Sequence, residues 1–272
     1  MSHLIIGGTG HTGAEIVRLL RERGHQARSA TRTARGDSSV RFDWLDASTH
    51  EAALADIEAV YMIAPPAQPD PLPLMAAFVE RALARGVRRF VLLSSSAVPD
   101  SAPGLGAVAR LLRERVPEWA VLRPSWFMQN FTDPANPRAR TVAVERKLYT
   151  STGDGRVAFV DARDIAAVAS WALTAAEAPN ASLLITGPEA LSYAQIAQQL
   201  SVELVHISDE EARDRFVRSG MPAEYAAMLV QLDADIREGA AETVTDTVDR
   251  TTGRRPRSFA EHLRDVRSAH HA

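Results

Sequence analysis

The sequence of 272 residues contains no cysteine, which excludes disulfide bonds and metal sites built on thiolates. Lysine is almost as scarce, because Lys147 is the only lysine among 31 basic residues. No apolar run approaches the roughly 20 residues that a membrane-spanning helix needs. The first residues read as a strand and carry no basic flank or cleavage site of a secretory signal. We therefore expect a soluble cytoplasmic protein.

The chain also lacks a large excess of positive or negative charge. Lysine and arginine total 31, aspartate and glutamate total 34, and the two signs are interspersed along the chain. Such a balance favours neither nucleic acid nor an anionic membrane as a partner. The eight histidines show no His-x-x-x-His spacing, so we expect no metal site.

The first 124 residues alternate short apolar strands with helices of amphipathic spacing. The expected strands cover residues 4–6, 26–30, 40–42, 59–63, 89–93 and 120–122, and the expected helices cover residues 14–23, 72–85 and 105–115. Apolar strands separated by helices are typical of a parallel sheet that is covered on both faces. The predicted fold class is therefore α/β, with a doubly wound Rossmann domain.

The second half is less regular and predicts a smaller C-terminal lobe. A helix over residues 161–174 and a strand over 183–186 return to the sheet, whereas residues from about 209 to 239 look helical and charged. Capping boxes are expected at Ser192 and Ser258. We assign residues 1–124, with 156–186 returning, to the dinucleotide-binding Rossmann core. Residues 125–155 and 187–272 form the predicted substrate-binding lobe.

A glycine-rich turn, Gly-x-x-Gly-x-x-Gly, lies between the first strand and the first helix. Gly7 and Gly10 let the backbone approach a phosphate, and Gly13 lets the helix pack close to the sheet. Free N–H groups at the helix start then face the anion. Because strand, turn and helix come in this order, we expect a bound dinucleotide rather than a plain connection. The expected contacts from the turn are Gly7, Thr9, Gly10, His11, Thr12 and Gly13.

The end of the second strand distinguishes NAD(H) from NADP(H). Folds that bind NAD usually carry an acid there for the ribose hydroxyls, but residues 29–35 contain none. Arg32, with Arg35 as a second clamp, suits the 2′-phosphate of NADP(H), because guanidinium groups bind phosphate bidentately. Solvated surface arginines are the alternative. Asp43 and Trp44 are candidate adenine neighbours, with ordinary packing as the alternative for Trp44.

Several longer motifs resemble those of the atypical short-chain dehydrogenase/reductase superfamily, in its NmrA-like branch. They are the glycine turn, Thr31-Arg32, residues 122–131 with their Arg-Pro-x-x-Phe-x-x-Asn run, residues 153–166 with Asp-x-x-Asp-Ile-Ala, and residues 184–192. The chain looks most like bacterial relatives of festuclavine dehydrogenase, an iminium-reducing enzyme of secondary metabolism. Quinone and dye reductases share this branch. The resemblance covers nearly the whole length and implies an NAD(P)H-dependent oxidoreductase.

The usual proton relay of that superfamily, Tyr-x-x-x-Lys, is absent. Lys147 would need a tyrosine at position 143, where the chain has Ala143. Hydride transfer itself does not require the relay, because the cofactor carries that chemistry. We therefore expect a small electron-poor substrate, an iminium, quinone, enone or carbonyl compound.

The carboxyl ends of the strands supply the remaining candidates, since doubly wound sheets bind their ligands there. The expected cofactor contacts at these ends are Ala64, Pro65, Ser94 and Pro124. The expected substrate pocket comprises Ser95, Trp126, Phe127 and Asn130, with core packing as the alternative for the two aromatic residues. The weak catalytic candidates are Ser95, Ser96 and Tyr149, with Tyr225 as a further proton donor. Strand-end capping is the alternative for the two serines.

For two acidic residues near the start of a predicted helix, a structural role is the preferred interpretation. Asp161 and Asp164 resemble a catalytic carboxylate pair, but acids at a helix start more often satisfy its free N–H groups. We expect them to position the following helix. Two function classes besides the reductase stay open: an NmrA-type redox sensor that binds NADP(H) without turnover, and an epimerase or isomerase with a bound cofactor. An open apolar pocket favours an enzyme, and a blocked or polar one favours a sensor.

Overall fold

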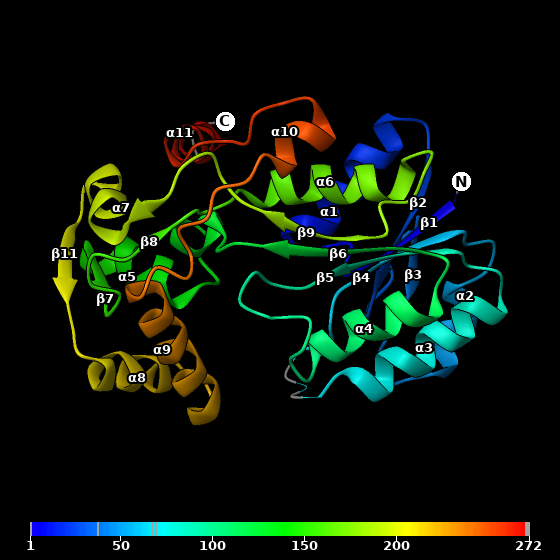
Figure 1. Cartoon of the computed structure of the whole chain (residues 1–272), viewed down its shortest axis with the longest axis horizontal. Helices are drawn as coiled ribbons and strands as arrows, with labels where there is room; N and C mark the ends of the chain where they lie inside the picture. The colour runs from blue at the N-terminus through cyan, green and yellow to red at the C-terminus, as the bar shows by residue number, and fades with distance from the viewer. Residues whose placement is uncertain (1, 37, 67, 69, 270–272) are drawn as a thin grey trace. The chain divides into compact units, whose positions relative to one another are not determined.

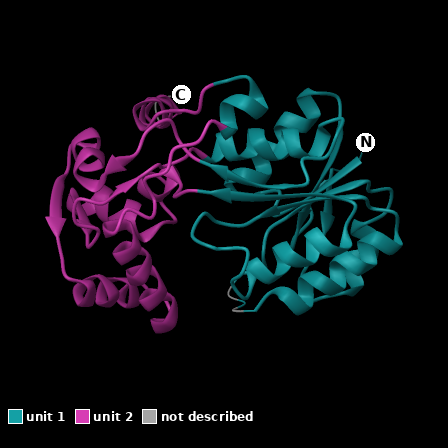
Figure 2. Ribbon diagram, viewed as in Figure 1, with its two compact units in different colours: residues 1–124, 162–185, 247–254 teal, residues 125–161, 186–246, 255–272 magenta. Residues whose placement is uncertain are grey.

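The computed structural model describes residues 2–36, 38–66, 68 and 70–269 (Figure 1). The chain divides into two compact units, which Figure 2 shows in different colours. Unit 1 comprises residues 1–124, 162–185 and 247–254, and unit 2 comprises residues 125–161, 186–246 and 255–272. These limits differ from the expected ones, because residues 156–161 and residue 186 belong to unit 2 and residues 247–254 belong to unit 1.

Unit 1 is built on a seven-stranded sheet in which all neighbouring strands are parallel. The strand order is β3-β2-β1-β4-β5-β6-β9. The strands are β1 Ser2–Ile6, β2 Gln26–Thr31, β3 Ser39–Arg41, β4 Ala59–Met62, β5 Arg89–Leu93, β6 Glu118–Pro124 and β9 Ala181–Ile185. The order reverses between β1 and β4, and this switch point is where doubly wound sheets form a crevice. The predicted fold class is confirmed.

Helices cover both faces of this sheet, with α1 and α6 on one face and α3 and α4 on the other (Figure 1). The helices of unit 1 are α1 His11–Glu22, α2 Ser48–Ala53, α3 Leu72–Ala84, α4 Leu105–Arg115, α6 Ala162–Thr174 and α10 Thr247–Thr252. Between α3, α4 and the sheet lies an apolar core that includes Leu4, Phe78, Phe90 and Leu112, all fully buried. The central strands β4 and β5 are almost fully buried because both faces of the sheet are covered, whereas β2 and β3 at one edge are more polar and partly exposed.

Unit 2 consists of short strand pairs and helices around an aromatic core. Its strands are β7 Lys147–Thr150, parallel to β11 Glu203–His206, and β8 Arg156–Val157, antiparallel to β10 Leu191–Ser192. Its helices are η1 Met128–Phe131, α5 Pro137–Glu145, α7 Tyr193–Leu200, α8 Asp209–Arg218, α9 Ala223–Arg237 and α11 Phe259–Ala269. Phe131 packs edge-to-face on Phe159, Tyr193 and Phe259, with ring centroids 5.1–5.9 Å apart. Edge-to-face contact is the favoured geometry of such pairs.

The helix starts predicted from capping boxes are confirmed, and the stretch predicted to be helical contains a turn. Both predicted capping boxes form, with Ser192 and Gln195 at the start of α7 and Ser258 and Glu261 at the start of α11. The predicted helical, charged stretch over residues 209–239 forms two helices, α8 and α9, because the chain turns at Gly220, whose φ is +96°. No helix within the described residues is long and apolar enough to cross a membrane.

Candidate functional site

The glycine turn between β1 and α1 is closed by its own backbone. Gly7 has a φ of +74°, its N–H donates to the carbonyl of Ala30 at 3.1 Å, and its carbonyl accepts from the N–H of Gly10 at 2.9 Å. A Cβ atom on Gly13 would lie 2.2 Å from the Gly7 carbonyl oxygen. Glycine is therefore required at position 7 for conformation and at position 13 for space.

The first turn of α1 is left without a side-chain cap. Gly10 is the N-cap residue and has no side chain to offer. The hydroxyl of Thr12 lies 3.0 Å from the hydroxyl of Tyr61, so it is engaged inside the protein. Burial raises the pKa of Tyr61, which keeps the phenol neutral. The N–H groups at a helix start need partners, and an uncapped start beside an open glycine turn suits an anion.

The same turn has room for a phosphate group. Thr9, Gly10 and His11 are exposed. A Cβ atom on Gly10 would meet only the Gly7 carbonyl oxygen, at 3.4 Å, so this face of the turn is open. A closed turn with one open face and an uncapped helix behind it fits the pyrophosphate of a dinucleotide.

Beyond β2 the chain exposes two arginines. Arg32 and Arg35 are solvent-exposed, and no described residue forms a hydrogen bond or ion pair with either guanidinium group. The backbone N–H of Arg35 donates to the Ser39 hydroxyl at 2.6 Å, which shapes the loop that carries both. Both arginines therefore have free donors at the end of β2, the position of the ribose in doubly wound folds.

Trp44 packs in the core of unit 1, which agrees with ordinary packing, the alternative to its interpretation as an adenine neighbour. Its ring meets Phe42 and Phe78 edge-to-face, with centroids 5.0 and 5.3 Å away, and its exposed fraction is 7%. Asp43 is half-buried, and its carboxylate accepts the N–H of Leu45 at 3.0 Å. Its own side chain thus stabilises the turn that follows β3.

The serines that follow β5 have different surroundings. Ser94 is buried. The hydroxyl of Ser95 accepts the N–H of Ala97 at 3.2 Å, which is the local capping role. The hydroxyl of Ser96 is buried and has no hydrogen-bond partner within the described residues. A buried hydroxyl without a partner is costly, so its position suits a polar group of a ligand. Pro124, at the end of β6, accepts the N–H of Ser96 at 2.9 Å, and Ala64 and Pro65 follow β4.

In unit 2, two predicted pocket residues line one cavity of about 210 Å³. Trp126 and Asn130 belong to it, and Phe127 is not among its lining residues. The amide oxygen of Asn130 accepts from the side-chain nitrogen of Asn136 at 3.1 Å. The further lining residues are Asn136, Pro137, Arg138, Phe216, Met221, Tyr225, Leu229, Leu232 and Asp233. We call this space the Trp126 cavity.

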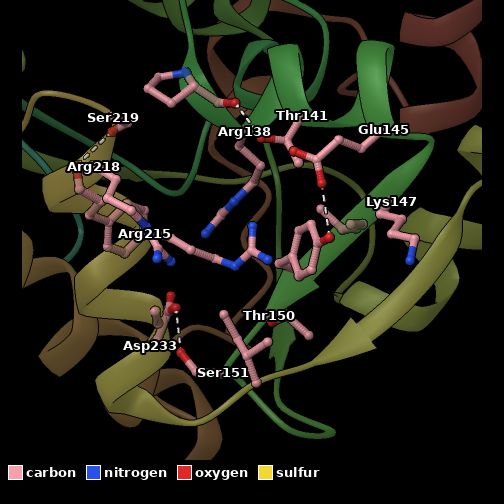
Figure 3. A pocket seen from close by; sticks show the side chains of 16 residues that line it. Arg138, Thr141, Glu145, Lys147, Thr150, Ser151, Arg215, Arg218, Ser219 and Asp233 are labelled. Atoms are coloured by element: carbon pink, nitrogen blue, oxygen red, sulfur yellow. Dashed lines mark hydrogen bonds between the residues drawn. The ribbon is translucent and has the colours of Figure 1, made fainter.

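Tyr149 lines a different cavity of unit 2, of about 260 Å³ (Figure 3). Its hydroxyl donates to the carboxylate of Glu145 at 2.9 Å. The guanidinium carbon of Arg215 lies 3.4 Å from the centre of its ring. Of the two tyrosines named as proton donors, Tyr225 therefore shares a cavity with Trp126 and Tyr149 does not. We call this second space the arginine cavity.

Asp161 is part of a buried chain of polar side chains in unit 2. One of its carboxylate oxygens lies 2.8 Å from Nδ1 of His262, and Nε2 of His262 lies 2.9 Å from the Thr132 hydroxyl. The amide of Gln129 donates to the other carboxylate oxygen at 3.3 Å. Asp161 and His262 are almost fully buried, and neither lines either cavity, so this chain fastens α11 to unit 2. No group of described residues has the composition of a metal site.

Sequence reasoning missed most of the Trp126 cavity. Met221, Leu229, Leu232 and Asp233 come from the stretch that the sequence predicts to be helical and charged, with no site assigned to it. The only available signal was the apolar spacing of residues 226, 229, 230 and 236 within that stretch. No sequence pattern indicated Arg138 as a lining residue, because the helix that carries it, α5, is not among the predicted helices.

Residues 7–176 match the family model described as NAD(P)H-binding. An uncharacterised oxidoreductase of Bacillus subtilis, YesF, is 39% identical over 267 residues, which cover 95% of this chain and 92% of the relative. Agroclavine dehydrogenase of Claviceps fusiformis is 34% identical over 281 residues, covering 97% of each chain. Among solved structures, the triphenylmethane reductase of Citrobacter sp. in complex with NADP(H) has a TM-score of 0.81 at 19% identity. The likeness covers 97% of this chain and 100% of the reductase.

Proposed function

Since the chain belongs to the NAD(P)H-binding family and is an NAD(P)H-dependent oxidoreductase, we propose that it is an NADPH-dependent reductase of a small electron-poor organic molecule. The Trp126 cavity carries the proposal. Its lining combines apolar and aromatic side chains with the polar groups of Asn130, Asn136, Arg138 and Asp233, and Trp126 and Asn130 come directly after β6 in the chain. An apolar cavity with a few polar groups is the usual form of a small-molecule site.

The preference for NADPH over NADH is supported by the end of β2. Arg32 and Arg35 are exposed, their guanidinium groups have no partner among the described residues, and residues 29–35 contain no acid. A free guanidinium group binds the 2′-phosphate of NADPH with charge-assisted hydrogen bonds. NADH has no phosphate there, so it would gain nothing from these groups.

The chain binds the cofactor with the groups described above. The glycine turn and the uncapped start of α1 hold the pyrophosphate, and the hydroxyl of Ser96 is available to a polar group of the cofactor or the substrate. NADPH supplies a hydride when it is bound. Among the expected substrates, an iminium suits this chain best, because its carbon accepts a hydride and the product amine needs no proton. The absence of Tyr-x-x-x-Lys then has no chemical consequence.

The proposal is tested by following NADPH oxidation with a panel of cyclic iminium compounds, quinones and enones. We expect turnover with at least one iminium compound. Replacing Trp126 by Ala removes an aromatic side chain from the cavity lining and should lower kcat/KM at least about tenfold, because the substrate loses an aromatic contact surface. Trp171→Ala is the matched control, since Trp171 lies in α6 and lines neither cavity.

Two results would contradict the proposal. The first is binding of NADPH without oxidation for any member of the panel, which would favour a redox sensor. The second is equal kcat/KM in the Trp126→Ala and Trp171→Ala proteins, which would place the substrate elsewhere.

A further inference from the structure

The arginine cavity lies in unit 2 between α5, β7, α8 and α9 (Figure 3). It shares Pro137, Arg138, Phe216 and Asp233 with the Trp126 cavity, but its other lining residues have no part in the function proposed above. Its volume of about 260 Å³ is slightly below the range of typical ligand pockets, so it has space for a molecule of about one ring. Arg138 from α5 and Arg215 from α8 both extend into it (Figure 3).

Arg138 is held in place with most of its donors unused. Its guanidinium group lies over the ring of Tyr193 at 5.0 Å and donates one N–H to the Tyr193 hydroxyl at 2.7 Å. No other described side chain accepts a hydrogen bond from this half-buried group. A guanidinium group carries five N–H donors. Burial opposes its charge, but Tyr193 and Asp233 outweigh burial and raise the pKa of Arg138.

Arg215 is fixed in a similar way and also keeps donors free. Its guanidinium group stacks on the ring of Tyr149, and its Nε donates to Glu211 at 3.3 Å. Within the described part of the chain, its two terminal nitrogens donate to no side chain. Stacking on an aromatic ring holds a planar guanidinium group in one orientation, so its terminal nitrogens are preorganised.

The acidic groups around the cavity decide which anion fits. The lining contains Arg138, Lys147, Arg215 and Arg218 on the basic side and Glu145 and Asp233 on the acidic side. Two further acids partly neutralise the bases from outside, because Lys147 pairs with Glu203 at 3.4 Å and Arg215 pairs with Glu211. Asp233 is buried and accepts from the Ser151 hydroxyl at 2.8 Å. The acidic groups in and around the cavity therefore balance most of its basic groups. This balance favours a singly charged anion over a phosphate as the ligand.

The remaining lining combines apolar side chains with the hydroxyl groups of Thr141, Thr150, Ser151 and Ser219, which are hydrogen-bonded within the protein. Leu148, Ile207, Ala212 and Phe216 line the cavity together with the ring of Tyr149. A planar apolar ring can pack on these side chains while a carboxylate receives the free donors of the two arginines. A carboxylate is the planar, two-oxygen acceptor that matches a guanidinium fork.

We propose that the arginine cavity is a binding site for a small aromatic or cyclic carboxylate, held between Arg138 and Arg215. None of the groups assigned to NADPH belongs to this site, and Arg215 lines it without lining the Trp126 cavity, although Arg138 lines both. Its ligand is recognised by one negative charge, two acceptor oxygens and one apolar ring.

The test uses benzoate as the probe and benzamide as its uncharged analogue, with binding to the full chain measured by calorimetry and by the rise in Tm. We expect saturable binding of benzoate and none of benzamide at the same concentrations. Arg215→Met should weaken benzoate binding at least about tenfold, because the variant loses charge-assisted hydrogen bonds. Arg215→Lys keeps the charge but not the fork and should also bind benzoate more weakly.

Arg213→Met is the matched control, because Arg213 lies on the same helix, is exposed and does not line the cavity. It should bind benzoate as the unmodified protein does. The proposal is overturned if benzamide binds as well as benzoate, if inorganic phosphate binds as tightly, if benzoate does not bind, or if the Arg215 and Arg213 variants behave alike. Folding of each variant is checked by its Tm without ligand, and none of these readouts depends on NADPH or on turnover.

Discussion

Replacing Gly13 by Ala tests how the glycine turn is built. The added methyl group would lie 2.2 Å from the carbonyl oxygen of Gly7 and 2.9 Å from the Cα of Gly8. These are backbone atoms of a closed turn, so no side-chain rotation can relieve the contact. Either α1 moves away from the sheet or the turn opens, and both changes displace the N–H groups at the start of the helix.

The size of the effect follows from two opposing contributions. Inserting a methyl group into a packed site costs about 1–3 kcal/mol, and contact with backbone places this position near the upper end. Alanine is a better helix former than glycine by about 1 kcal/mol, which offsets part of that cost. The free energy of unfolding should therefore fall by about 2 kcal/mol. Loss of one charge-assisted hydrogen bond to the pyrophosphate should weaken NADPH binding by at least about tenfold.

Urea unfolding and NADPH titration measure the two effects, and Gly10→Ala is the matched comparison. Gly10 has a φ of −82°, and its added methyl group would meet only one atom, at 3.4 Å. That variant should keep its stability and still lose affinity, because its methyl group occupies the open face of the turn. Unchanged stability of Gly13→Ala would refute the packing argument. Normal NADPH affinity of Gly10→Ala would refute the assignment of the turn to the pyrophosphate.

Three further predictions concern cofactor preference, stability and pH. Arg32→Ala should raise the Kd of NADPH at least about tenfold and leave that of NADH unchanged, as titration of both would measure. His262→Ala should lower the free energy of unfolding by about 3 kcal/mol in urea denaturation, because the buried carboxylate of Asp161 loses a partner at 2.8 Å. Burial lowers the pKa of His50 below 6.5, so the unfolded chain takes up a proton more readily than the folded one. Its neutral form stabilises the fold above pH 6.5, and that stabilisation should decline as the pH falls below this value. Replacing His50 by Gln should make the free energy of unfolding less steep between pH 6.5 and 5.

Each of these predictions has an outcome that contradicts it. If Arg32→Ala weakened the binding of NADPH and NADH equally, Arg32 would not be the group that binds the 2′-phosphate. A stability change below about 0.5 kcal/mol in His262→Ala would mean that Asp161 is satisfied without the imidazole. An unchanged pH slope in His50→Gln would assign the acid sensitivity to other groups, such as His3, whose pKa burial also lowers.

The sequence by itself determined the features that depend on neighbouring residues. The alternation of apolar strands and helices predicted the doubly wound sheet, because each strand must bury both faces. The spacing of Gly7, Gly10 and Gly13 predicted the turn, and Ser192 and Ser258 predicted the two helix starts, since capping acts over three residues. The family resemblance, read from local motifs, is confirmed by the relatives that cover nearly the whole chain.

Only the tertiary structure decided what depends on residues far apart in the chain. Ser95 and Ser96 are equivalent in sequence, yet Ser95 caps its own loop and Ser96 is left buried without a partner in the described structure. Asp161 meets His262 across 101 positions, which no local pattern reports. The two cavities of unit 2 are lined from four or more separate segments each, so their composition depends on how these segments pack. Periodicity and spacing act within one element, whereas a cavity is a property of the packing between elements.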